Sequence, residues 1–247
     1  MIIKIKTKDF NFQKTFDSGL FYFFYEDEPI REVYIGELVN LKFKQIKNEL
    51  IISCSKELKK EHKNSLVKRI KYCFGLEEDL TEFYKICKKD VVLKNYLDKI
   101  KETRIFSAFS DFESLVGAII SQNNSYRNYR KQMLAVYKKL NFIQENYTEK
   151  NLSGLKLGYK IPFLVFLARD FGKIEISKIK GIGNYSKNLF EIFQKRNYNS
   201  FYIDCLTEKI MREKYKIKGN LEEESKKLWG KYRGLAEAYL QRFFEIK

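Results

Sequence analysis

Residues 179–187 read Ile-Lys-Gly-Ile-Gly-Asn-Tyr-Ser-Lys, and this stretch is the most distinctive local pattern in the chain. It lies between a short apolar segment at residues 174–179 and an amphipathic segment at residues 189–193. Two glycines one residue apart allow a tight turn with positive φ. The pattern therefore predicts two helices that are joined by a hairpin at Gly181 and Gly183.

This hairpin is suited to hold an anion. Glycine amides can approach a phosphate closely, and at a helix N-terminus they favour negative charge. Lys178, Lys180 and Lys187 surround the turn, and no acidic residue lies between Ile176 and Phe190. The pattern is that of a helix-hairpin-helix, which grips DNA phosphate without reading sequence. An ordinary helix–helix turn that contains glycine would look the same.

Asp204 follows Gly183 by 21 residues, and the residues after it predict the start of a helix with Asp204 as N-cap. Asp is favoured at any N-cap, where it contributes about 1 kcal/mol, so the position alone does not indicate a function. A fixed carboxylate beside a sugar would also stabilise the oxocarbenium charge that develops as an N-glycosidic bond breaks, or orient the attacking water.

Residues 121–127 read Ser-Gln-Asn-Asn-Ser-Tyr-Arg and follow a predicted helix. From Ser121 to Lys139 there are five Lys and Arg and no acidic residue. Asn123 and Asn124 could enter a duplex and fill the gap that an extruded base leaves, with Arg127 beside them. An ordinary polar turn between helices is the alternative.

Composition favours a polyanionic partner. The 247 residues include 48 Lys and Arg against 32 Asp and Glu, which gives a net charge of +16 and a pI near 9.4. Such an excess is typical of nucleic-acid binding, although a Lys-rich codon bias would also produce it. Four Cys without a C-x-x-C spacing and a single His in a charged run disfavour zinc, iron–sulfur and His-based chemistry.

The period of the hydrophobic residues changes near residue 58. Before it, alternation predicts strands at residues 3–7, 19–25, 33–36, 39–46 and 50–54, which form an antiparallel sheet. After it, helical spacing predicts helices as far as Phe244, one of which begins at Ser110 or Asp111. We therefore expect an α+β fold. The start of the chain reads as a strand without a signal peptide, so we expect a cytoplasmic protein.

In this order and at these distances, the motifs resemble the helix-hairpin-helix base-excision DNA glycosylases. The resemblance covers nearly the whole chain. It rests on residues 112–125, on Leu-Gly-Tyr-Lys-Ile-Pro-Phe-Leu at 157–164, on residues 181–183, on Asp204 and on residues 229–240. It is closest to the branch without an iron–sulfur cluster, which holds 3-methyladenine DNA glycosylase II and the 8-oxoguanine DNA glycosylases.

The resemblance implies a sheet domain at residues 1–57 and a helical domain at residues 58–247, whose two lobes flank an active-site cleft. It implies a monomer that binds double-stranded DNA with a damaged base and associates with the nucleoid, away from any membrane. The enzyme would need no cofactor, although K⁺ or Na⁺ could bind the backbone carbonyls of Gly181 and Gly183. Asp204 would be catalytic, and Gly181, Gly183, Lys180, Lys187 and Arg127 would bind phosphate.

Members of the family that also cleave the strand carry a Schiff-base Lys two positions after the second hairpin Gly, and Tyr185 stands there in this chain. Lys187 lies roughly 200° around a helix from Tyr185, so it should not substitute for the Schiff-base Lys. We therefore expect a monofunctional enzyme with water as the nucleophile. Tyr185 would line the base pocket, unless it only packs beneath the hairpin.

The lesion is harder to assign. An aromatic Tyr185 suits a cationic alkylated purine such as 3-methyladenine. Asn123 and Asn124 look more like the 8-oxoguanine branch, but that branch's base-reading Gln and aromatic correspond to Glu237 and Gln241, and its His to Leu206. Alkylated purines rank first, then oxidised guanine, then deaminated or mismatched bases. A lesion-binding protein without catalysis is the alternative from a different functional class.

Overall fold

The computed structural model describes residues 1–19 and 23–245. Its N-terminal part is a four-stranded antiparallel sheet. The strands are β1 (Ile2–Lys6), β2 (Ile30–Tyr34), β3 (Leu38–Ile46) and β4 (Glu49–Cys54), in the order β1-β4-β3-β2. Ile52 pairs with Ile3 on one side and with Phe43 on the other. The predicted antiparallel sheet is therefore confirmed.

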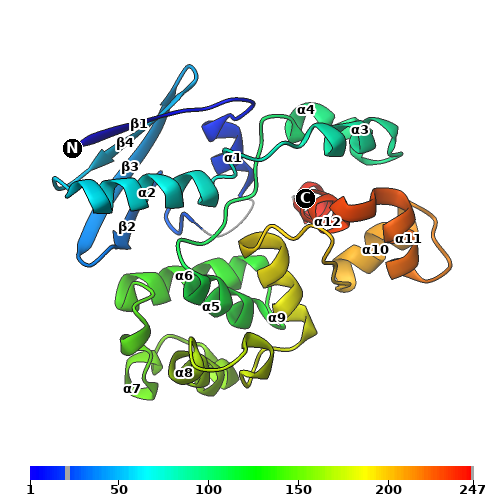
Figure 1. Ribbon diagram of the computed structural model, residues 1–247. Coiled ribbons are helices and arrows are strands. Elements are labelled where there is room, and N and C mark those ends of the chain that lie inside the picture. The colour runs from blue at the N-terminus through cyan, green and yellow to red at the C-terminus, as the bar shows by residue number, and fades with distance from the viewer. Residues whose placement is uncertain (20–22, 246–247) are drawn as a thin grey trace.

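One face of this sheet is buried because apolar and polar residues alternate along its strands. Helix α2 (Lys60–Cys73) lies along the sheet in Figure 1 and adds Leu66, Ile70 and Cys73 to the same hydrophobic cluster. The packing unit of the sheet thus extends beyond residue 57, where the sequence placed the start of the helical domain.

The segment before β2 differs from the prediction. Residues 12–18 form helix α1 (Phe12–Ser18), which Asn11 caps by accepting a hydrogen bond from Lys14 N and which ends at Gly19 with φ +60°. The strand predicted at residues 19–25 is wrong at residues 23–25, which are irregular, and its residues 20–22 lie outside the described residues. Phe23 is instead fully buried among aromatic rings of the sheet cluster, and this packing takes the place of a strand ladder.

Helices make up the rest of the described chain, as predicted. They are α3 (Thr81–Lys89), α4 (Leu97–Ile100), α5 (Asp111–Ser121), α6 (Tyr126–Leu140), α7 (Glu149–Leu152), α8 (Ile161–Asp170), α9 (Asn184–Leu189), α10 (Cys205–Glu213), α11 (Leu221–Trp229) and α12 (Arg233–Glu245). Figure 1 shows α5–α9 below the sheet and α10–α12 beside α3. None of these described helices is long and apolar enough to cross a lipid bilayer.

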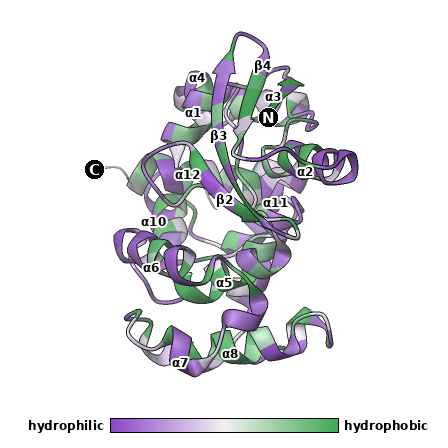
Figure 2. Ribbon diagram, turned by 90° about the vertical axis from the view of Figure 1, so that its left-hand side faces the viewer, coloured by the Kyte–Doolittle hydropathy of each residue, from purple (hydrophilic) through white to green (hydrophobic). Residues whose placement is uncertain are grey.

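Helix α5 is the centre of the helical part. Ser110 caps it by accepting a hydrogen bond from Glu113 N, in agreement with one of the two predicted caps. The sequence predicted one apolar face, but all residues from Phe112 to Ile120 are buried because α6, α8 and α9 surround the helix. In Figure 2, α5 is largely hydrophobic beside the more hydrophilic α6.

Two arginines tie the sheet and its helix α2 to the rest of the chain. Arg31 on β2 pairs with Glu113 on α5, with its two terminal nitrogens 2.8 and 2.6 Å from the two carboxylate oxygens. The Arg31 side chain is 2% exposed, and four aromatic rings lie within 5.7 Å of its guanidinium carbon. Removal of one partner would leave the other charge buried and unpaired, so the pair fixes α5 against the sheet.

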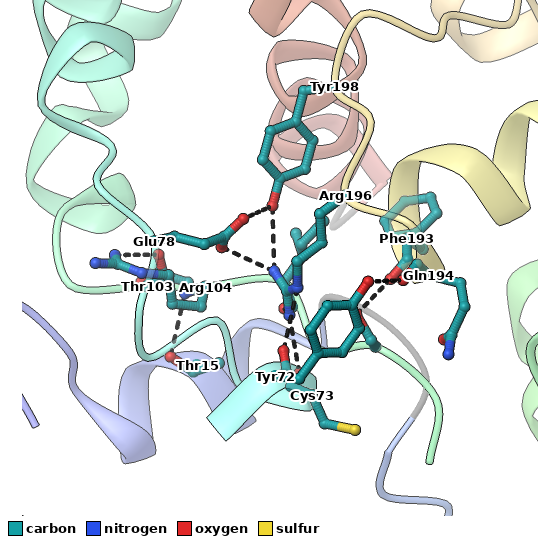
Figure 3. A network of polar contacts seen from close by, with 12 residues as sticks. Thr15, Tyr72, Cys73, Glu78, Thr103, Arg104, Phe193, Gln194, Arg196 and Tyr198 are labelled. Atoms are coloured by element: carbon teal, nitrogen blue, oxygen red, sulfur yellow. Dashed lines mark hydrogen bonds and ion pairs between the residues drawn. The ribbon is translucent and has the colours of Figure 1, made fainter. Parts of the chain in front are cut away.

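The second arginine follows α9 and is shown in Figure 3. Arg196 donates to the carbonyl oxygens of Tyr72 and Cys73 at the end of α2 and forms an ion pair of 2.8 Å with Glu78. Tyr198 donates a hydrogen bond of 2.5 Å to the same carboxylate. These contacts hold the chain that leaves the hairpin helix against the C-terminal end of α2.

Candidate active site

The glycine hairpin precedes α9 as predicted, although the segment before it is only a short 3₁₀ turn (Ile176–Lys178). Gly181 has φ +99°, and a Cβ atom there would lie 2.6 Å from Phe163 Cβ on α8. Gly183 is the N-cap of α9 with φ −94°, and a Cβ there would meet no described atom within 4 Å. Only the first glycine is thus required by the turn itself.

The polar turn after α5 is bound to the hairpin. Gln122 Nε2 donates to Gly181 O at 2.8 Å and to Ser186 Oγ at 2.7 Å. Beneath the turn, Lys160 Nζ donates to Ile120 O at 2.6 Å, and burial lowers the pKa of this Lys. The structure therefore brings together three motifs that are distant in sequence: the polar turn, the 157–164 stretch and the hairpin.

The two asparagines that the sequence proposed for intercalation differ in their surroundings. Asn123 is exposed and has φ +46°, and its Nδ2 lies 3.3 Å from Tyr159 OH. Asn124 is directed inward, where its Nδ2 donates to Ile120 O and to Gln132 Oε1. The side chain of Asn123 is therefore accessible from solvent, whereas the amide of Asn124 links α5 to α6.

The predicted phosphate-binding cations are on the surface. Lys180, Lys187 and Arg127 are all exposed, and the Lys180 ammonium lies 5.0 Å from the centre of the Phe166 ring. Glu175, just before the hairpin, is 3.6 Å from Lys178 Nζ. The hydroxyl of Ser177, together with Lys178 and Lys187, lowers the pKa of its carboxyl. The hairpin therefore keeps a positive surface despite one nearby acid.

Asp204 caps α10 as predicted and makes a second contact that the sequence did not indicate. Its Oδ1 accepts from Thr207 N at 2.7 Å, and its Oδ2 accepts from Gln241 Nε2 on α12 at 3.0 Å. Tyr202 OH donates to Gln241 Oε1 at 3.1 Å, and the Tyr202 ring meets the Tyr185 ring edge-on at 5.2 Å. Tyr185 and Asp204 are thus connected through Tyr202 and Gln241.

A buried carboxyl group lies behind this set. Glu237, one turn before Gln241 on α12, is 1% exposed and accepts from Thr207 Oγ1 at 2.9 Å. Burial raises its pKa well above the ordinary 4.5, and the Asp204 charge adds to this shift. In sequence, Glu237 and Gln241 were visible only as departures from a family pattern, and their spacing of four residues on a predicted helix was the one available signal.

A monovalent cation at the hairpin stays a prediction. Gly181 O accepts from Gln122 Nε2, and Gly183 O accepts from Lys187 N at 2.9 Å. A carbonyl oxygen has two lone pairs, so each retains one that could face a cation. Among the described residues, His, Cys, Asp and Glu do not cluster into a metal site.

The cysteines differ in exposure. Cys205 follows Asp204 and is exposed, whereas Cys54, Cys73 and Cys87 are buried. Burial raises the pKa of all three buried thiols, to about 12 for Cys73 and Cys87. All four cysteines are free thiols.

A cavity of about 210 Å³ lies between α1, α6 and α12. Its described lining includes Asp17, Tyr126, Met133 and Arg242. Arg242 directly follows Gln241, so the cavity and the Asp204 cluster share helix α12. Tyr185 and Asp204 themselves are not among the described residues that line it.

Comparisons with known proteins agree with this architecture. Residues 2–115 match the family described as 8-oxoguanine DNA glycosylase, N-terminal domain. Among solved structures, MBOgg1 in complex with a low-affinity DNA ligand is 20% identical, with a TM-score of 0.75 over 98% of this chain and 94% of that one. The apo form of the Clostridium acetobutylicum 8-oxoguanine glycosylase/lyase is 19% identical, with a TM-score of 0.74 over 98% of both chains.

The 3-methyladenine DNA glycosylase from Archaeoglobus fulgidus is 16% identical, with a TM-score of 0.79 over 99% of this chain and 100% of that one. At these identities the likeness shows a common fold, a sheet followed by a helical region. No curated protein matches the chain by sequence.

Proposed function

We propose that the chain is a helix-hairpin-helix DNA glycosylase, which excises a damaged base from duplex DNA by hydrolysis. Residues 2–115 match the N-terminal domain of the 8-oxoguanine DNA glycosylases, and the fold is similar to that of solved 8-oxoguanine and 3-methyladenine enzymes. The observation that carries the proposal is the Asp204 carboxylate, which two hydrogen bonds hold in place next to the Tyr185–Tyr202 ring pair.

The surface around the hairpin would bind the DNA. Phosphate would meet the amides at the start of α9 and the exposed Lys180 and Lys187, while Asn123 enters the base stack. Because Gln122 joins the turn to the hairpin, both contacts would be offered in one fixed geometry. The lesion would then leave the stack and face the aromatic rings near Asp204.

Asp204 would perform the chemistry. As the glycosidic bond breaks, positive charge develops on the sugar, and a fixed carboxylate stabilises it without having to reorganise. The same carboxylate can orient the water that attacks the sugar carbon, which leaves a free base and an abasic site. The fixed position of the Asp204 carboxylate matters, because charge stabilisation and water orientation both weaken steeply when the carboxylate is displaced.

Asp204→Asn tests this role. Asn is also a good N-cap, so the variant should fold and bind DNA with nearly unchanged affinity. Base release, measured as strand breaks after hot alkali, should be abolished. Asp98→Asn, at an exposed position on α4, is the matched control and should be fully active. Base release by Asp204→Asn would contradict the assignment, and tight binding without release by the native protein would favour the non-catalytic alternative.

We propose further that the enzyme does not cleave the strand. Tyr185 stands two positions after Gly183, and Lys187 is exposed while Tyr185 is half-buried, so the two residues face different ways. Lys160 has a lowered pKa, but its ammonium group is held by Ile120 O beneath the turn. Borohydride should therefore trap no covalent adduct with lesion DNA. An adduct that Lys187→Ala or Lys160→Arg removes would show a lyase.

An alkylated purine is the substrate class that we rank first. Such a lesion carries a positive charge, and the ring pair Tyr185–Tyr202 would attract it by about 1–2 kcal/mol when desolvated. Its weak glycosidic bond needs little help from a general acid. A specific observation favours 8-oxoguanine as the second candidate, since residues 2–115 match the N-terminal domain of that enzyme family.

Duplexes that contain 3-methyladenine, hypoxanthine or 8-oxoguanine separate these candidates. Release of 3-methyladenine that falls in Tyr185→Leu and persists in Tyr185→Phe would support the aromatic role, because only the ring is needed. Release confined to 8-oxoguanine would replace the first candidate by the second.

A further inference from the structure

Glu237 is a buried carboxyl group to which the proposed reaction assigns no part. Its Oε2 has no hydrogen-bond partner among the described residues. The charged groups that act on it are Asp204 at the start of α10 and Arg233 in the first turn of α12. Arg233 is directed elsewhere, to Glu222 on α11 at 3.3 Å and to Asn199 O at 2.6 Å. Burial without a paired cation favours the neutral acid.

Glu237 sets the direction of a chain of hydrogen bonds. The single hydroxyl hydrogen of Thr207 is donated to Glu237 Oε1 at 2.9 Å. Thr207 Oγ1 can then face Gln241 only as an acceptor, and it accepts from Gln241 Nε2 at 2.8 Å. The second hydrogen of this amide nitrogen is thereby directed to Asp204 Oδ2 at 3.0 Å.

Reversal of the hydrogen bonds between Thr207 and Gln241 would remove a donor to Asp204. Without an acceptor at position 237, the Thr207 hydroxyl could rotate and donate to the Gln241 amide oxygen. The amide would then turn, and no N–H group would face Asp204 from α12. Tyr202 OH, which donates to Gln241 Oε1 at 3.1 Å, supports the observed orientation from the side of Tyr185.

We propose that Glu237 is a positioning residue that acts as a neutral carboxylic acid: it fixes the hydrogen-bond direction through Thr207 and Gln241 and so holds Asp204 in its reactive orientation. This inference rests on the proposed function of Asp204. An ionised Glu237 would still accept from Thr207, but it would place a second negative charge behind Asp204, so the protonated form is the active one.

Three variants and one control test the inference. Glu237→Gln keeps the shape and the acceptor and should retain base release at neutral pH within about twofold. Glu237→Leu and Thr207→Val each break the chain and should lower kcat about tenfold, the size expected for one lost hydrogen bond to a charged group, with little change in KM. Glu213→Gln, at an exposed position of α10, should behave as the native enzyme.

The pH profile separates positioning from a merely structural role. Native activity should fall as the pH rises through the raised pKa of Glu237, because the neutral acid is lost. Glu237→Gln cannot ionise and should lack this fall. Glu237→Gln as inactive as Glu237→Leu, or with the native alkaline fall, would overturn the inference.

Infrared spectroscopy gives a readout without turnover. The native protein at neutral pH should show the carbonyl stretch of a protonated carboxyl group, which Glu237→Gln removes and Glu213→Gln keeps. Absence of this band in the native protein would also overturn the inference. If Glu237→Leu fails to fold, Thr207→Val still breaks the chain at a residue of similar shape. Failure of Asp204→Asn to lose activity would instead refute the proposed function and leave the infrared result standing.

Discussion

The two hairpin glycines have different requirements, although both come from one motif. Gly181 combines φ +99° with a near contact to Phe163, whereas Gly183 has ordinary φ and open space at its Cα. Gly181→Ala should therefore destabilise the protein by roughly 2 kcal/mol or more through strain and overpacking. Gly183→Ala should retain the native unfolding free energy and lose DNA affinity, because its Cβ occupies the space before α9 that a phosphate would enter.

Urea unfolding and a DNA titration of the two variants check this pair. Equal unfolding free energies of Gly181→Ala and Gly183→Ala would contradict a clash between a Cβ atom at position 181 and Phe163. Unchanged DNA affinity of Gly183→Ala would argue against phosphate binding at the start of α9.

Glu237 also makes stability depend on pH. Its pKa is raised above 4.5 in the folded protein, so the native state keeps a proton that the unfolded state releases. Its contribution to the unfolding free energy is complete below pH 4.5 and is lost as the pH rises towards the folded pKa, by up to about 1.4 kcal/mol per pH unit. Native and Glu237→Gln proteins should thus diverge in unfolding free energy as the pH rises above 4.5, and parallel curves would contradict a raised pKa.

At this scale the sequence predicted the residues that belong to local motifs. The places of Gly181, Asn123 and Asp204 in a turn, a loop and a helix cap were predicted because such patterns are read within a few neighbouring residues. The partners of Asp204 could not be found this way, since Gln241 is 37 residues away and reaches it only when α12 packs on α10. Likewise, the inward direction of Asn124 depends on Gln132 of the next helix.

Among the elements, the polar turn after α5 and the hairpin form one unit through Gln122. Gln122→Ala removes its bonds to Gly181 O and Ser186 Oγ and should lower the unfolding free energy by about 1–2 kcal/mol. DNA affinity should fall as well, because the turn and hairpin would no longer be held in one geometry. Gln13→Ala, which loses only an exposed contact with Asp17, is the control. A loss of stability with unchanged DNA affinity would confine Gln122 to a structural role.

Elements with a clear period were predicted, and those that depend on packing were not. The alternation in β1, β3 and β4 and the helical spacing in α2 and α5 identified these segments. Helix α1 was missed because its Phe-rich surroundings have high strand propensity, while the Asn11 cap and burial of Phe12 decide the outcome. The full burial of α5 could not be anticipated either, since three helices from later in the chain create it.

For the whole molecule, charge predicts the salt dependence of DNA binding. The net charge is +16, and each phosphate contact contributes about 0.9 to the slope of log affinity against log salt. The double variant Lys180→Ala/Lys187→Ala should reduce this slope by about 1 to 2. Lys42→Ala/Lys44→Ala, on exposed positions of the sheet, should change it little. Equal slopes for all three proteins would place the DNA on another face.

The arrangement of sheet and helices was predicted, but not what joins them. Arg31 with Glu113 is a buried pair and Arg196 with Glu78 a partly buried one, between residues 82 and 118 positions apart. In the sequence, these arginines are indistinguishable from the many exposed basic residues. Their burial follows from tertiary packing alone.

The distribution of thiols gives this protein a built-in attachment point for a probe. Three of its four cysteines are buried with raised pKa values, and the exposed Cys205 is adjacent to Asp204. A thiol-reactive dye should therefore modify one site rapidly in the native protein and all four only in denaturant. Fluorescence at Cys205 would then report arrival of a lesion in the native sequence without an engineered cysteine, and DNA should protect the thiol from modification.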